Sequence, residues 1–89
     1  MDRSILVKEL ASFLFIYGIF GREIEESTIK SNIESSLEKV DFVESLINKL
    51  NIEARKRKYI DIEKLKELLL ELERIRIDLD FKDFNKKSK

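Results

Sequence analysis

The 89-residue sequence has no cysteine, histidine, tryptophan, proline or glutamine, and it has only two glycines. The lack of cysteine excludes a disulfide framework and a thiolate zinc site. Because histidine is missing as well, the commonest general bases and nucleophiles of enzymes are absent. No segment shows the alternating oxygen ligands that a carboxylate calcium site requires. We therefore expect a protein that is not an enzyme and that takes no metal, no cofactor and no small-molecule substrate.

A dominant charge is also missing, because 18 lysines and arginines balance 18 aspartates and glutamates. A neutral chain has no strong overall attraction to nucleic acid or to an anionic membrane. Abundant lysine, glutamate and isoleucine, without cysteine or glutamine, resemble the composition of thermophile proteins. The length predicts one small interaction domain over residues 1–84, followed by a flexible tail at residues 85–89.

The main hydrophobic feature is the run at residues 10–20, which is apolar on every side of a helix. A bilayer span needs about 20 apolar residues, so this run is too short to cross a membrane. No small-residue cleavage site follows it, and we therefore expect a cytoplasmic protein that has no membrane partner. A helix that is apolar all round must be covered all round, and a short chain can cover only part of it.

Part of this first helix is therefore expected to bind another chain, either a second copy in a homodimer or an obligate protein partner. One face can be buried by the chain's own helices, whereas Phe15, Ile16 and Ile19 would form a surface that soluble monomers rarely expose. The residues predicted to form the protein interface are Leu10, Phe13, Leu14, Phe15, Ile16, Tyr17, Ile19, Phe20, Ile24, Ile29 and Ile33.

Glycines and the spacing of apolar residues predict where the helices of the chain lie. Gly18 and Gly21 are expected to end the first helix, because glycine adopts the left-handed conformation that stops a helix. Apolar residues at helical spacing predict a second helix that begins near residues 25–27, a third near residues 41–50 and an amphipathic helix at residues 61–74.

Local signals at the ends of these helices complete the prediction. Asp41 and Glu44 have the spacing of a capping box, and Asp61 can cap the helix that follows it. Residues 51–54 begin either a short helix or an extended link. The predicted fold class is all-α, a small bundle of four helices with a short C-terminal extended or β segment.

The C-terminal segment has two interpretations. Apolar and charged residues alternate strictly from Ile75 to Lys82, which is typical of a strand. A heptad pattern that continues to Leu79 would instead prolong the helix. We expect an extended segment at residues 75–84 that contacts a partner. The residues predicted to make this C-terminal partner contact are Ile77, Leu79, Phe81 and Phe84.

A basic connector is predicted at residues 55–60. Its four consecutive cations are Arg55, Lys56, Arg57 and Lys58, next to a tyrosine. Cations beside an aromatic ring can contact the phosphates and bases of nucleic acid. The neutral total charge favours the other interpretation, a solvated connector between helices, so a nucleic-acid contact here would be weak.

Two further segments have a characteristic pattern, residues 21–34, GREIEESTIKSNIE, and residues 43–50, VESLINKL. They resemble the N-terminal dimerisation domain of the acidic stalk protein of archaeal and eukaryotic ribosomes. That family has an apolar first helix, then Gly-Lys-x-Ile, then a helix with Ile/Val-Lys-x-x-Leu-Glu, and a third helix with Val-x-x-Leu-Val-x-x-Leu. Residues 51–53 match the Asn-Ile-Glu start of its fourth helix.

The resemblance covers roughly residues 10–54 and implies a dimerising four-helix platform. The sequence departs from the family at residues 35–38, where the family has a longer loop with a glycine. The family's Ala/Gly-rich hinge and acidic C-terminus are not in this sequence, so recruitment of translation factors is not implied.

Together these features predict a non-catalytic protein–protein interaction subunit, a dimerising or docking module of a larger archaeal nucleoprotein machine. One alternative is an accessory subunit of an archaeal replication or transcription complex, such as a DNA polymerase holoenzyme. Another is a small helical nucleic-acid-binding protein that uses the basic connector.

Overall fold

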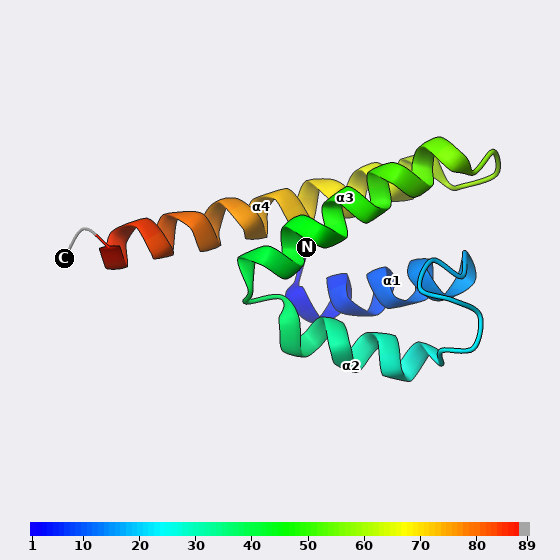
Figure 1. The fold of residues 1–89 in the computed structure, drawn as a ribbon, viewed down its shortest axis with the longest axis horizontal. Coiled ribbons are helices and arrows are strands. Elements are labelled where there is room, and N and C mark those ends of the chain that lie inside the picture. The colour runs from blue at the N-terminus through cyan, green and yellow to red at the C-terminus, as the bar shows by residue number, and fades with distance from the viewer. Residues whose placement is uncertain (88–89) are drawn as a thin grey trace. The chain divides into compact units, whose positions relative to one another are not determined.

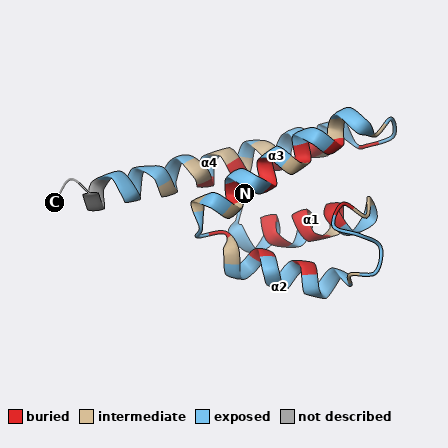
Figure 2. Ribbon diagram, viewed as in Figure 1, coloured by how far each residue is buried: buried red, intermediate tan, exposed pale blue. Residues whose placement is uncertain are grey.

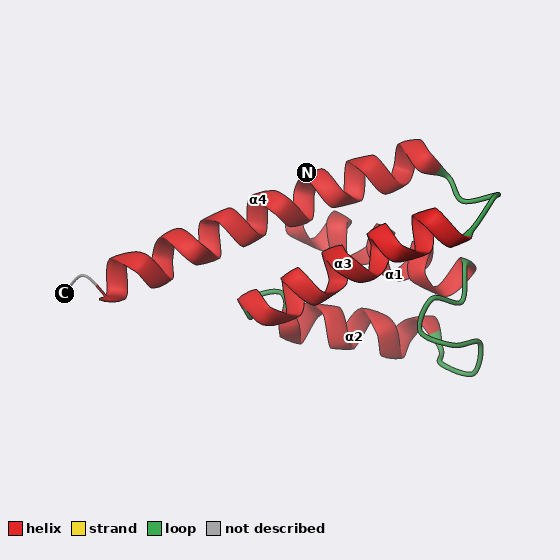
Figure 3. Ribbon diagram, turned by 45° about the horizontal axis from the view of Figure 1, so that its top comes forward, coloured by secondary structure: helices red, strands yellow, loops and turns green. Residues whose placement is uncertain are grey.

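The computed structural model describes the backbone of residues 1–87 and the side chains of residues 1–84. This part of the chain folds into four α-helices and contains no strand (Figures 1 and 3). The helices are α1 (Arg3–Ile16), α2 (Glu26–Ser36), α3 (Val40–Lys56) and α4 (Ile62–Lys87). The predicted all-α class with four helices is confirmed. The tail expected at residues 85–89 begins within α4, and residues 88–89 lie outside the described part of the chain.

The helices pack in two pairs, each of which forms a compact unit. α1 packs against α2 in the unit Met1–Ser36, and α3 packs against α4 in the unit Leu37–Lys89. Figure 2 shows that buried residues recur along the helices of each pair. The first unit buries Leu6, Val7, Leu10, Ala11, Phe13, Leu14, Ile19, Ile29 and Ile33. The second buries Leu37, Val43, Leu46, Ile47, Leu50, Ile60, Leu65, Leu68, Leu72 and Ile75. The single interaction domain expected over residues 1–84 stays a prediction.

A glycine turn ends α1, as the sequence predicts. The N–H of Gly18 donates to the carbonyl of Phe15 (3.0 Å), and the N–H of Ile19 donates to the carbonyl of Leu14 (3.0 Å). This pair of bonds is the Schellman motif, which satisfies carbonyls that the helix leaves free. Gly18 has φ +60°, a conformation that residues with a Cβ adopt only at a cost in energy.

α3 begins two residues earlier than the capping box predicts and continues further than the predicted third helix. Its N-cap residue is Lys39, which makes no side-chain capping bond, so the predicted box at Asp41 and Glu44 is wrong. Asp41 lies instead in the first turn, where its negative charge interacts favourably with the helix dipole. Residues 51–54 belong to α3 itself and form neither a separate helix nor an extended link.

The start of α4 matches the prediction. Asp61 precedes the helix, and its side-chain Oδ1 accepts a hydrogen bond from the N–H of Lys64 (3.1 Å). This bond satisfies one of the backbone donors that a helix start leaves without an internal partner.

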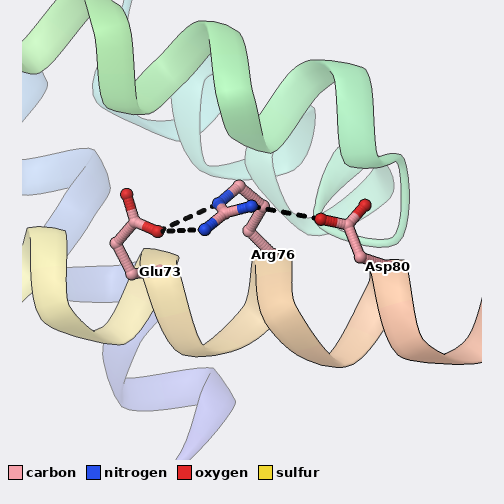
Figure 4. A network of polar contacts seen from close by, with 3 residues as sticks. All are labelled: Glu73, Arg76 and Asp80. Carbon is pink, nitrogen blue, oxygen red and sulfur yellow. Dashed lines mark hydrogen bonds and ion pairs between the residues drawn. The ribbon is translucent and has the colours of Figure 1, made fainter.

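The extended segment predicted at residues 75–84 is wrong, because α4 continues to Lys87 without interruption. The side-chain contacts have helical spacing: Arg76 bonds Glu73 three residues before it and Asp80 four residues after it (Figure 4). A helix satisfies its own backbone groups, whereas a lone strand would leave them unpaired.

α4 is longer than the helix it packs against. Its 26 residues extend about 39 Å, whereas the 17 residues of α3 extend about 26 Å. A short turn joins the two helices, and the C-terminal part of α4 continues past the first residues of α3 (Figures 1 and 3). This part of α4 therefore has no neighbouring helix within its own unit.

Candidate protein interface

Three large apolar side chains are exposed at the C-terminal end of α1 and in the turn that follows it. Ile16 is 69% exposed, Phe15 44% and Phe20 41%. We call these three residues the α1 patch. Isolated exposed apolar residues are normal on protein surfaces, but three within six positions form a cluster that is typical of an interaction site.

Helix geometry explains why this cluster is exposed. A helix turns about 100° per residue, which places Phe15 and Ile16 about 140° and 120° away from Leu10. Leu10 is fully buried against the rest of the chain. Ile5 lies on the same outer side as Ile16 and is exposed too. Lys8 separates Ile5 from the patch, so the apolar surface is concentrated at the C-terminal end of α1.

One residue of the predicted exposed face is buried. Ile19 is almost fully covered, although the sequence places it on the outer side of a continuous helix. The Schellman turn at Gly18 reverses the chain, and the apolar residue after such a turn commonly packs back against the last helical turn. Phe20, the next residue, is exposed in its place.

The other residues predicted for the interface belong mostly to the core of the first unit. The rings of Phe13 and Tyr17 pack together with centroids 4.7 Å apart and planes tilted by 56°. Tyr17 and Ile24 remain partly exposed. The buried members of the predicted set are Leu10, Phe13, Leu14, Ile19, Ile29 and Ile33. Of the predicted set, a partner that binds the folded unit can therefore reach Phe15, Ile16 and Phe20 most directly.

The four cations of the predicted basic connector occupy different structural positions. Arg55 and Lys56 lie in the last turn of α3, where positive charge favours the negative end of the helix dipole. Arg57 is the C-cap residue, and its backbone N–H donates to the carbonyl of Glu53 (3.0 Å). Lys58 is exposed in the turn before α4.

A buried carboxylate anchors this end of α3. The Nε of Arg57 donates to Oε2 of Glu53 (2.7 Å), and the Nζ of Lys49 lies 3.6 Å from Oε1. The hydrogen bond from Arg57 lowers the pKa of Glu53, the positive charges of Arg57, Lys49 and Lys56 lower it further, and burial opposes them. Glu53 is therefore ionised at neutral pH, and it forms an ion pair with the side chain of Arg57.

Tyr59 is the most exposed aromatic residue described, at 91%, and it lies beside Lys58. Arg55, Lys56 and Lys58 are exposed as well, so these three cations and Tyr59 are accessible to a nucleic acid. The nucleic-acid contact expected here stays a prediction.

The predicted C-terminal contact residues are exposed, but they do not share one face. Ile77, Phe81 and Phe84 point to the same side of α4, whereas Leu79 points to the opposite side and is partly covered. Leu70 joins the first three on their side and is also exposed. Sequence reasoning missed Leu70, although its seven-residue spacing from Ile77 was a usable signal.

The described residues contain no cluster of three side chains able to hold a metal ion. Within the same part of the chain, no helix is long and apolar enough to cross a membrane. Comparisons with protein families, with curated proteins and with solved structures give no match to this chain.

Proposed function

We propose that this protein is a non-catalytic protein–protein interaction subunit that associates through the α1 patch. The observation that carries the proposal is the exposure of Phe15, Ile16 and Phe20 at the end of a helix whose opposite side is fully buried. Large apolar side chains that a unit exposes in a cluster lower the free energy when a second surface covers them.

The proposed partner is a second copy of the chain. Full burial of a large apolar side chain contributes roughly 1.5–3 kcal/mol, and the patch residues are already partly covered, so each adds less. A two-fold pair contributes every residue of the patch twice, which helps to offset the entropy lost on association. The resemblance to the ribosomal stalk platform also favours dimerisation through the first helix.

At a finer level, we propose a dimerising or docking module of a larger archaeal nucleoprotein machine, as the stalk resemblance implies. The same patch would serve an accessory subunit of a replication or transcription complex, with another protein as its partner. The two proposals differ in the occupant of the α1 patch, so the self-association of the isolated chain separates them.

Charged substitutions in the patch test its role. Ile16→Lys combined with Phe20→Lys should convert a dimer into a monomer, measured by sedimentation velocity, because lysine resists burial in an apolar contact. Ile52→Lys is the matched control, since Ile52 is an exposed isoleucine of the other unit. Circular dichroism should show unchanged helix content in both variants. A double variant that stays dimeric would remove the patch from the interface.

A second candidate function is nucleic-acid binding at residues 55–59, and it rests on the exposure of Tyr59 beside Lys58. Lys58→Ser combined with Tyr59→Ala tests it without breaking the ion pair between Arg57 and Glu53. If the site binds phosphates, affinity for single-stranded DNA should fall and its dependence on salt should flatten. Undetectable DNA binding by the unmodified chain at low salt would exclude this function.

A further inference from the structure

α4 has a second apolar face, opposite the one that packs against α3. Its members are Leu70, Ile77, Phe81 and Phe84, and we call them the α4 stripe. At about 100° per residue, all four lie within an arc of about 60°. Phe81 and Phe84 are 65% and 68% exposed, although both are large aromatic side chains. The buried leucines of α4 lie on the other side of the helix.

The stripe has the spacing by which one helix packs along another. Leu70, Ile77 and Phe84 are seven residues apart, which corresponds to the d positions of a heptad repeat. Phe81 occupies an a position, and Arg74 occupies the a position before it. Side chains at a and d form the seam into which the side chains of a partner helix insert. The stripe therefore fits a helix rather than a loop or a small molecule.

The e and g positions between Leu70 and Phe84 carry charges of one sign. The heptad places four residues at the e and g positions beside the seam, and all four are acidic: Glu71, Glu73, Asp78 and Asp80. Residues at e and g select the partner of a helix through their charges. The acidic edges therefore favour a partner with positive charges beside its own seam.

Two arginines offset part of this charge and fix the carboxylates in place. Arg76 lies between two of them, with Nη2 2.8 Å from Oε2 of Glu73 and Nη1 3.1 Å from Oδ2 of Asp80 (Figure 4). Nη1 of Arg74 lies 3.7 Å from Oε1 of Glu71. Four carboxylates and two guanidinium groups leave an excess of negative charge along the stripe, and Asp78 and Asp80 are exposed.

The same charges disfavour a second copy of this chain as the occupant. In a parallel pair, Glu73 of one helix would approach Asp78 of the other, because g meets e of the partner. In an antiparallel pair, g meets g and e meets e, which would bring acidic residues together as well. Like charges in these positions act against pairing. An anionic membrane surface would be repelled for the same reason.

We propose that the α4 stripe docks an amphipathic helix of a partner protein that carries lysine or arginine on both edges of its apolar seam. The stripe supplies the apolar contact, and the acidic edges select the partner and its alignment. The stripe and the α1 patch share no residue, so the two proposals are tested by different substitutions.

Three synthetic helical peptides of equal length test the proposal against the full chain by fluorescence anisotropy. The first has leucine at a and d and lysine at e and g; the second replaces the lysines with glutamate. The third keeps the lysines and replaces the leucines with serine. We expect the first to bind and the other two to bind at least about tenfold more weakly. Equal binding of the first and second, or of the first and third, would overturn the proposal.

Substitutions in the chain locate the binding and test its selectivity. Phe81→Ser should weaken binding of the first peptide by about tenfold. Asp78→Lys combined with Asp80→Lys should reverse the preference, so that the glutamate peptide binds better than the lysine peptide. Ile16→Lys, in the α1 patch, is the control and should leave peptide binding unchanged.

Two other occupants give distinct results. If Phe81→Ser abolishes self-association of the chain in sedimentation velocity, the stripe binds a second copy and the proposal fails. Binding to phosphatidylglycerol vesicles that is lost in Phe81→Ser would likewise replace the protein partner with a membrane. Because Phe81 is exposed, circular dichroism of this variant should match that of the unmodified chain.

Discussion

At the scale of single residues, Glu53 has the most distinctive environment in the described part of the chain. It is the one buried charged residue there, and every buried polar side-chain atom described has a hydrogen-bond partner. Its bond to Arg57 ties the last turn of α3 to the residue that begins the turn into α4. The carboxylate should therefore contribute to stability only while it is ionised.

Replacing Glu53 with glutamine tests this dependence on pH. The pKa of Glu53 in the folded protein is lowered from its ordinary value of 4.5, so its contribution is present above about pH 4.5 and is lost as the pH falls through the lowered pKa. We expect Glu53→Gln to reduce the free energy of unfolding by about 1 kcal/mol at pH 7. Urea denaturation should show a smaller difference between the two proteins at pH 3 than at pH 7.

Gly18 provides a second test at this scale. Its φ of +60° is strained for residues with a Cβ, and a Cβ there would lie 3.3 Å from Cγ of Arg22. Gly18→Ala should therefore lower stability by about 1 kcal/mol, measured as a lower midpoint of thermal unfolding. Gly18→Asn should cost less, because asparagine tolerates the left-handed conformation better. An equal loss in both variants would contradict the role assigned to the turn.

At the scale of elements, the sequence predicted four helices and the start of α4, but it missed the start and the full length of α3 and the distance that α4 continues. The alternation from Ile75 to Phe81 has a structural cause that fits a helix as well as a strand. Two residues of a helix advance about 200°, which is nearly the opposite side. Ile75 and Leu79 thus fall toward the core side of α4, whereas Ile77 and Phe81 fall on the outer side. A helix with two opposite apolar faces can therefore show the same alternation of apolar and charged residues as a strand with one apolar face.

A pair of leucines separates the two faces of α4 experimentally. Leu72 is fully buried, whereas Leu70 is more than half exposed. Leu72→Ala should lower the free energy of unfolding by about 2–5 kcal/mol. Leu70→Ala should change it by no more than about 0.5 kcal/mol. Similar losses in urea denaturation would show that the two faces are assigned incorrectly.

At the scale of the whole molecule, the pairing of the helices into two units left no sequence signal. The boundary at Ser36 and Leu37 has no proline or glycine, and its composition does not change there. The all-α class followed from apolar spacing, which depends only on local geometry. Which helices pair depends on contacts between distant residues, and a single sequence does not encode those contacts in a periodic pattern.

The candidate interface was predictable only where it depends on local helical spacing. An all-apolar first helix implied an exposed face, and Phe15 and Ile16 are exposed as that argument requires. The burial of Ile19 depended on the backbone geometry of the glycine turn, which the helical pattern does not contain. The strand interpretation prevented recognition of the α4 stripe. It assigned Leu70 to a helix and the other three members to an extended segment.

The central claim is that the α1 patch joins two copies of the chain, and the molecular mass in solution tests it most directly. Sedimentation equilibrium of the unmodified protein over a wide concentration range should give about twice the chain mass of 10.6 kDa. Self-association should weaken with Ile16→Lys and remain with Phe81→Ser. A mass of 10.6 kDa at every concentration, for a chain that stays in solution without a partner, would contradict the claim.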